Sequence, residues 1–198
     1  MKTYKILPIL ALLALPILTS CTKDEILTVK DENSTYDSLS TAKIALIVDS
    51  LPFAYPDSAT IAYLQFLRGE EYLAHDVYEL FYTQHGSRIF GNIRQSELRH
   101  TTAIQNLLEK YSIPDPEADH VAGVFANPEL QALYNALVLT GSADLTKALE
   151  VGRTIEITDI EDIDNFLGLT QQEDIVFVLN NLRAGSERHL RAFNAWLD

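Results

Sequence analysis

The segment RIFGNIRQSELRHTTAIQNLLEKY, residues 88–111, decides how this chain folds. Its apolar residues recur every three or four positions, which predicts an amphipathic helix with one buried stripe. Glu97 and His100 interrupt the centre of that stripe, and their i, i+3 spacing places both side chains on one face. A carboxylate buried there is costly unless it is paired or bound to a cation. The apolar members of the stripe are Phe90, Ile93, Ile104, Leu107, Leu108 and Tyr111.

The same helical periodicity continues along the chain and predicts an all-α fold. No alternating strand pattern and no internal repeat competes with it. We therefore expect a four-helix bundle with one additional short helix, which begins with Asn127 as N-cap and Pro128 in its first turn. The expected long helices span about residues 58–84, 88–111, 142–167 and 171–197, and the short one spans about 127–139.

The other long helices carry polar interruptions of their own apolar stripes. In the first, Glu70 lies closest to the centre of the stripe, and Glu71 at its edge is the alternative or a supporting group. In the third, Glu156 and Asp159 lie three residues apart, and in the fourth His189 follows Ser186 at the same spacing. The expected inward-facing metal ligands are Glu70, Glu97, His100, Glu156, Asp159 and His189.

These ligands match the inventory of ferritin-like carboxylate bundles. Such bundles use one glutamate from each of two helices and a Glu-x-x-His motif from each of the other two. Four carboxylates balance two divalent cations, and oxygen and nitrogen ligands suit iron, or iron with manganese. Ser186 stands where the second motif would have its glutamate, so either Asp159 supplies that carboxylate or the site holds one metal. Tyr78, like Glu71 and Ser186, is expected to support the ligands.

Four stretches of the chain resemble a known bacterial and archaeal family, the ferritin-like domain of unknown function 2202. The similarity extends from about residue 58 to the end of the chain. It implies a ferritin-like fold and a metal site, and it assigns no activity. The stretches are EEYLAHDVY at 70–78, SELRH at 96–100, NPELQALY at 127–134 and GSERHLRAF at 185–193.

The first 57 residues have the organisation of an exported lipoprotein. Residues 1–20 combine a basic start with a short apolar run, as in a signal peptide. The run ends in a sequence that resembles a lipobox, in which Cys21 would carry the lipid; a free thiol after an ordinary signal peptide is the alternative. Residues 21–57 are expected to form a polar linker with a short docked helix near 44–48, followed by the bundle domain at 58–198. We expect this lipid to anchor the protein to a membrane of the cell envelope, on the periplasmic or the cell-surface face.

Charge and cysteine content exclude other functions. The 198 residues carry a formal net charge of −13, which opposes binding to nucleic acid. Cys21 is the only cysteine, so a four-cysteine iron site is excluded and a redox enzyme would need an external electron donor. Three functions stay open: an oxidoreductase that reacts with peroxide or dioxygen, a metal-binding or storage protein without turnover, and a metal-free interaction domain. The oligomeric state also stays open, with a homodimer among the options.

Several other polar residues are expected at the surface. His75, His85 and His120 fall on exposed helix faces or in loops, and Asp162 and Asp164 fall off the core stripe of the third helix. None of them is predicted to be a ligand.

Overall fold

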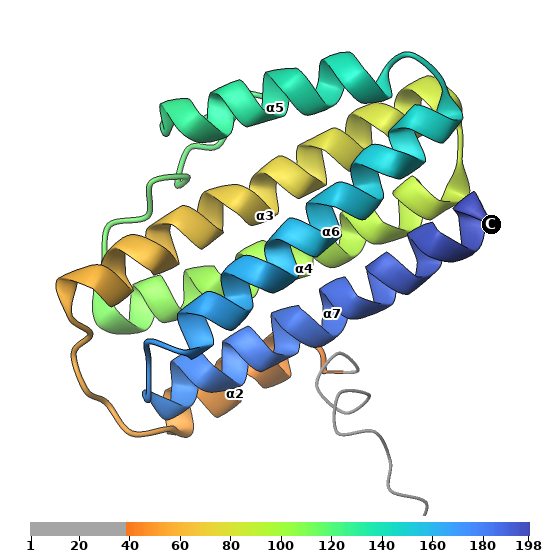
Figure 1. Ribbon diagram of the computed structural model, residues 1–198. Coiled ribbons are helices and arrows are strands. Elements are labelled where there is room, and N and C mark those ends of the chain that lie inside the picture. Colours follow the sequence, from red (N-terminus) through yellow and green to blue (C-terminus); the bar gives the residue numbers. More distant parts are fainter. Residues whose placement is uncertain (1–38) are drawn as a thin grey trace, which may run out of the picture.

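The computed structural model describes residues 39–198, which contain six helices and no β-strand (Figure 1). The predicted all-α class is confirmed for this part of the chain. No helix within it is long and apolar enough to span a membrane. The signal peptide expected at residues 1–20 and the lipidation expected at Cys21 lie outside the described residues.

The helices lie close to the positions predicted from periodicity. The docked helix expected in the linker is present as α2, and the short helix before the third long one is α5. The bounds are Thr41–Ser50 for α2, Ser58–His85 for α3, Arg88–Tyr111 for α4, Pro128–Gly141 for α5, Leu145–Leu167 for α6 and Glu173–Leu197 for α7.

Local capping residues set several of these boundaries. Asp57 and Asp144 each accept a hydrogen bond from a main-chain N–H three residues further on, and so begin α3 and α6. Asp144 therefore starts α6 three residues later than the predicted position 142. Gly86 ends α3 with a φ of 64°, a left-handed conformation that glycine adopts without strain, and the chain turns directly into α4.

The long helices pack as two pairs, α3 with α4 and α6 with α7 (Figure 1). Contacts between α4 and α7 and between α3 and α6 join the pairs around a common interior. Helix α5 lies against α3 and α6, while α2 lies against α4 and α7. The two short helices therefore cover different sides of the molecule.

The interior contains two apolar clusters with a polar level between them. One cluster includes Leu64 and Leu67 of α3, and the other begins on the same helix at Leu73. Each of the other long helices also contributes apolar residues to both clusters. The polar residues between those two stretches therefore lie at the same level along the bundle. Packing thus brings the interruptions predicted separately for each helix to a common place.

A buried ion pair fastens α2 to α4 and α7. Lys110 Nζ lies 2.6 Å from Asp174 Oδ2, and the Tyr111 hydroxyl donates to the same oxygen over 2.6 Å. Lys110 also donates to the carbonyls of Val48 and Leu51, over 2.7 and 3.1 Å. These carbonyls lie at the C-terminal end of α2, where a cation is favourable. Since Asp174 is fully buried, its charge depends on these partners rather than on water.

Replacing Asp174 by asparagine is expected to lower the free energy of unfolding by about 3 kcal/mol, because Lys110 would stay buried without its carboxylate. Urea denaturation of Asp174→Asn beside the wild type measures this loss. The control, Lys147→Met, breaks an exposed pair with Glu150 on α6 and should leave the unfolding midpoint unchanged. Equal shifts in the two variants would contradict the importance of the buried pair.

Candidate metal centre

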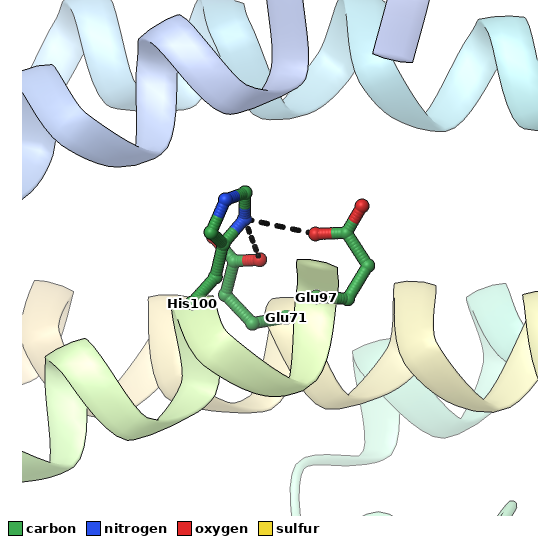
Figure 2. A group of neighbouring side chains, drawn as sticks. All are labelled: Glu71, Glu97 and His100. Atoms are coloured by element: carbon green, nitrogen blue, oxygen red, sulfur yellow. Dashed lines mark hydrogen bonds and ion pairs between the residues drawn. The ribbon is translucent and has the colours of Figure 1, made fainter. Parts of the chain in front are cut away.

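Two groups of buried side chains occupy the polar level between the apolar clusters. The first is Glu71 of α3 with Glu97 and His100 of α4 (Figure 2). The second is Glu97 with Glu156 of α6 and His189 of α7. Within each group the ligand-type atoms all lie within 4.8 Å of one another. Because Glu97 belongs to both groups, the five residues form one continuous site, which we call the Glu97 cluster.

Both imidazoles of the Glu97 cluster present Nδ1 to carboxylates. His100 Nδ1 lies 3.2 Å from Glu71 Oε2 and 2.9 Å from Glu97 Oε2 (Figure 2). His189 Nδ1 lies 2.8 Å from Glu97 Oε1 and 3.4 Å from Glu156 Oε2. The two rings stack with their centroids 5.6 Å apart. Each of the four long helices therefore contributes to the same small volume.

Several polar atoms of the Glu97 cluster have no hydrogen-bond partner among residues 39–198. They are Glu71 Oε1, Glu97 Oε1, His100 Nε2 and His189 Nδ1. Glu97 Oε1 and His189 Nδ1 face each other at 2.8 Å without the alignment of a hydrogen bond. An unsatisfied buried polar atom costs about 1–3 kcal/mol. A divalent cation could satisfy buried oxygen and nitrogen atoms of this kind, and this set of carboxylates and imidazoles suits such an ion.

Burial and mutual contact shift the pKa values in the Glu97 cluster. Burial raises the pKa of Glu71 to about 8, against the opposing attraction of His100. Burial also opposes ionisation of Glu97, but the two imidazoles outweigh it and hold its pKa well below the usual range. Burial lowers the pKa of His189, but Glu97 and Glu156 outweigh it and raise that pKa to about 9. A metal ion that binds here must therefore displace protons.

Glu70, the ligand predicted from α3, lies beside the Glu97 cluster rather than within its two groups. Its carboxylate faces Asp159 and Asp162 of α6, and burial together with these two charges raises its pKa to about 9. Glu71, the alternative at the edge of the predicted stripe, faces His100 of α4 instead. The two neighbours point apart because each helical residue turns the side chain by about 100°.

Asp159 also lies outside the two groups, and it forms a pair with Ser186. The Ser186 hydroxyl donates to Asp159 Oδ2 and also contacts the Leu182 carbonyl at 3.2 Å. Burial, followed by the charge of Glu71, raises the pKa of Asp159 well above its usual value. The pair thus lies next to the cluster, with a carboxylate on α6 hydrogen-bonded to the serine of α7.

Tyr78 contacts the Glu97 cluster directly. Its hydroxyl donates to Glu156 Oε1 over 2.6 Å and lies 3.3 Å from the Gly152 carbonyl. Burial and the charge of Glu156 raise the pKa of Tyr78 well above 10, so the phenol keeps its proton. Tyr78 can therefore orient Glu156 as a hydrogen-bond donor.

His120 lies in the connection between α4 and α5, as expected, but its side chain is only 9% exposed instead of lying at the surface. Its Nε2 lies 2.9 Å from Asp76 Oδ2, its Nδ1 lies 2.9 Å from Glu117 Oε2, and its ring stacks on Tyr72 at 4.0 Å. Asp76 also accepts the Gly123 N–H over 2.7 Å. These contacts tie the connection between α4 and α5 to α3. The sequence contained no signal for them, because they depend on how a long connection folds back.

The fold and the Glu97 cluster together define an all-α protein with a buried carboxylate–histidine site that could hold a metal ion. Residues 60–198 match the family described as an uncharacterized protein domain, DUF2202, and the chain belongs to this family.

The chain is also similar to a further protein and to a solved structure. The chain is 47% identical over 127 residues to the uncharacterized protein MJ0754 of Methanocaldococcus jannaschii, which covers 64% of this chain and 69% of the relative. It is also similar to the crystal structure of hypothetical protein MJ0754 from Methanococcus jannaschii. That match has a TM-score of 0.73 and 44% identity, and it covers 74% of this chain and 84% of the other. Neither description states a function.

The metal-free protein is expected to lose stability as the pH rises from 6.5 to about 9. Folded His189 keeps its proton up to a pKa of about 9, against an ordinary value of 6.5, so its contribution is lost across this interval. Glu71 has the same sign, because its pKa of about 8 exceeds the ordinary 4.5 and its deprotonation disfavours the folded state. Thermal unfolding in a chelator across this range measures the trend.

The matched variant for this measurement is Glu71→Gln, in which the slope should be shallower. Glu150→Gln, an exposed change on α6, should keep the wild-type slope. Stability that rises with pH over the interval would contradict the shifts described above.

Proposed function

We propose that this protein is a ferritin-like metalloprotein that binds two divalent ions, with Glu97 as the carboxylate between them. The position of Glu97 carries the proposal. Its Oε2 faces His100, and its Oε1 faces His189 on the opposite pair of helices. A carboxylate with one oxygen directed toward each of two ligand groups is suited to bridge two ions.

The distribution of ligands over the helices supports a ferritin-like four-helix bundle, with α5 as the additional short helix. Helices α3 and α6 each supply a glutamate, Glu71 and Glu156, while α4 and α7 supply the histidines. This is the ferritin-like pattern except at Ser186. The Ser186–Asp159 hydrogen bond places a carboxylate close to the position where the second motif lacks one.

We propose iron, or iron with manganese, as the bound metal. Three carboxylates and two imidazoles form the cluster, and these ligand types suit both metals. The only cysteine of the chain is Cys21, far in sequence from every member of the cluster. With two ferrous ions bound, the site would supply two electrons that, with two protons, reduce hydrogen peroxide to two waters. An external electron donor would then restore the ferrous state.

Attachment to a membrane of the cell envelope is part of the proposal. The support is the sequence Leu18-Thr19-Ser20-Cys21, which follows a basic start and an apolar run. The net charge of −13 disfavours adhesion to anionic headgroups, so the lipid on Cys21 would have to provide the attachment.

The purified protein, reconstituted anaerobically with ferrous ion, is expected to bind two irons per chain by elemental analysis. Glu97→Ala should lose both, because each group depends on Glu97, while Glu71→Ala should lose one. Affinity at each affected position should fall by about 100-fold or more. Glu150→Gln, which removes an exposed carboxylate from α6, is the control and should retain two irons. A wild-type protein that binds no iron would sink the proposed function.

Turnover separates an oxidoreductase from a storage protein. We expect the iron-loaded protein to consume hydrogen peroxide and to develop a ferric absorption band that an added reductant bleaches. His100→Ala should lose both responses, because the ion beside His100 would lose its nitrogen ligand. Iron bound tightly in wild type without peroxide consumption would instead favour metal binding or storage.

A further inference from the structure

We propose that Asp162, Glu70 and Asp159 form an uptake path along which divalent cations reach the Glu97 cluster. This inference rests on the proposed function, because it concerns how the same site is filled. It assigns a role to three carboxylates that lie outside the two ligand groups.

A cavity of about 70 Å³ borders the Glu97 cluster between α3, α5 and α6. On its inner side it is lined by Glu71, Glu97 and Glu156, whereas neither histidine of the cluster lines it. Leu133 and Leu137 of α5 line its outer side. Since a cavity of about 10–15 Å³ already holds one water molecule, this one can admit an ion together with water. The carboxylate face of the cluster is therefore its accessible face.

The three proposed carboxylates connect the outside of the molecule to this face. Asp162 is partly exposed, and its carboxylate lies within hydrogen-bond range of Glu70. Asp159 is the next charged neighbour of Glu70, and both residues line the cavity. Asp159 in turn faces Glu71, Glu156 and Glu97. Each of these carboxylates thus has another within electrostatic reach, which offers an ion a succession of oxygen ligands from Asp162 to the cluster.

Two carboxylate oxygens at the cavity have no hydrogen-bond partner within the protein, which indicates that they are available to bind a cation. Glu71 lines the cavity and is 2% exposed, and its Oε1 has no hydrogen-bond partner in the described part of the chain. Glu70 Oε2 is also buried and unpartnered there. No lysine or arginine is among the residues that line the cavity, so no cation of the protein competes for these oxygens.

The chemistry of the path favours a hard divalent cation in transit. Carboxylate oxygens bind such ions, but Glu70, Asp159 and Asp162 do not converge as a ligand group in the way that the members of the Glu97 cluster do. Binding at each carboxylate is therefore weak enough for release. The final position adds nitrogen ligands from His100 and His189, so the ion gains affinity as it moves inward.

The test is the rate at which the metal-free protein takes up cobalt(II), followed by stopped-flow absorption, with the final stoichiometry measured separately. Asp162→Asn and Glu70→Gln should each slow uptake by about tenfold, since an amide cannot release a proton and become a charged oxygen ligand when a cation arrives, as a carboxyl group can. Both variants should still bind two ions at equilibrium. The matched control is Glu161→Gln, an exposed carboxylate next to Asp162, which should keep the wild-type rate.

A second variant tests the route without changing charge. Leu137→Trp would fill the outer side of the cavity, and it should slow uptake while the stoichiometry stays at two. Wild-type rates in all three path variants would overturn the path and leave the proposed function intact. Loss of one bound ion in Glu70→Gln would also overturn it, because Glu70 would then be a ligand. A wild-type protein that binds no cobalt would overturn the proposed function itself.

Discussion

This structure depends on one constraint: glutamate side chains are buried halfway along the long helices, where water cannot solvate their charges. Glu71, Glu97 and Glu156 are each no more than 2% exposed, and Glu97 has a ligand-type atom within 4.8 Å of one from each of the other two. Isolated charges in such a place would cost several kcal/mol each, so they need protons, imidazoles or metal ions as partners. His100 and His189 pair with some of these carboxylate oxygens. Other oxygen and nitrogen atoms of the cluster still have no hydrogen-bond partner. The fold thus holds together a site that an ion would complete.

The Glu97 cluster is not symmetric, and the asymmetry has consequences for its chemistry. The pair α3 and α4 supplies a glutamate and a complete Glu-x-x-His motif, whereas α7 carries Ser186 in place of the second glutamate. Ser186 hydrogen-bonds Asp159, which lies on the side of the cavity beneath α5. Asp159 of α6 thus brings a carboxylate next to the position at which α7 carries a serine.

Two polar networks outside the cluster hold the short elements in place. On one side, Lys110 joins the end of α2 to Asp174 at the start of α7. On the other, the buried Arg68 pairs with Asp115 at 3.0 Å, and Asp76 holds His120 and the connection that leads to α5. The second network matters for the site, because α5 supplies the outer lining of the cavity. A structural role for these ionic groups accounts for their burial without assigning them to the metal centre.

The sequence by itself determined where each long helix lies and which of its side chains face inward, because both depend only on the order of residues within that helix. Helical periodicity and capping residues predict the long helices to within about three residues, and the interrupted stripes predict that Glu97, His100, Glu156 and His189 face inward. Family membership follows from the same stretches.

Only the tertiary structure decided which of the two adjacent glutamates on α3 belongs to the Glu97 cluster. Glu70 and Glu71 both border the apolar stripe of α3, and the rotation of α3 against α4 and α6 turns Glu71 toward His100 and Glu70 toward Asp159. The Ser186–Asp159 bond and the burial of His120 likewise join residues far apart in the chain. Periodicity fixes a side chain's direction relative to its own helix axis, but contacts between helices fix what it meets.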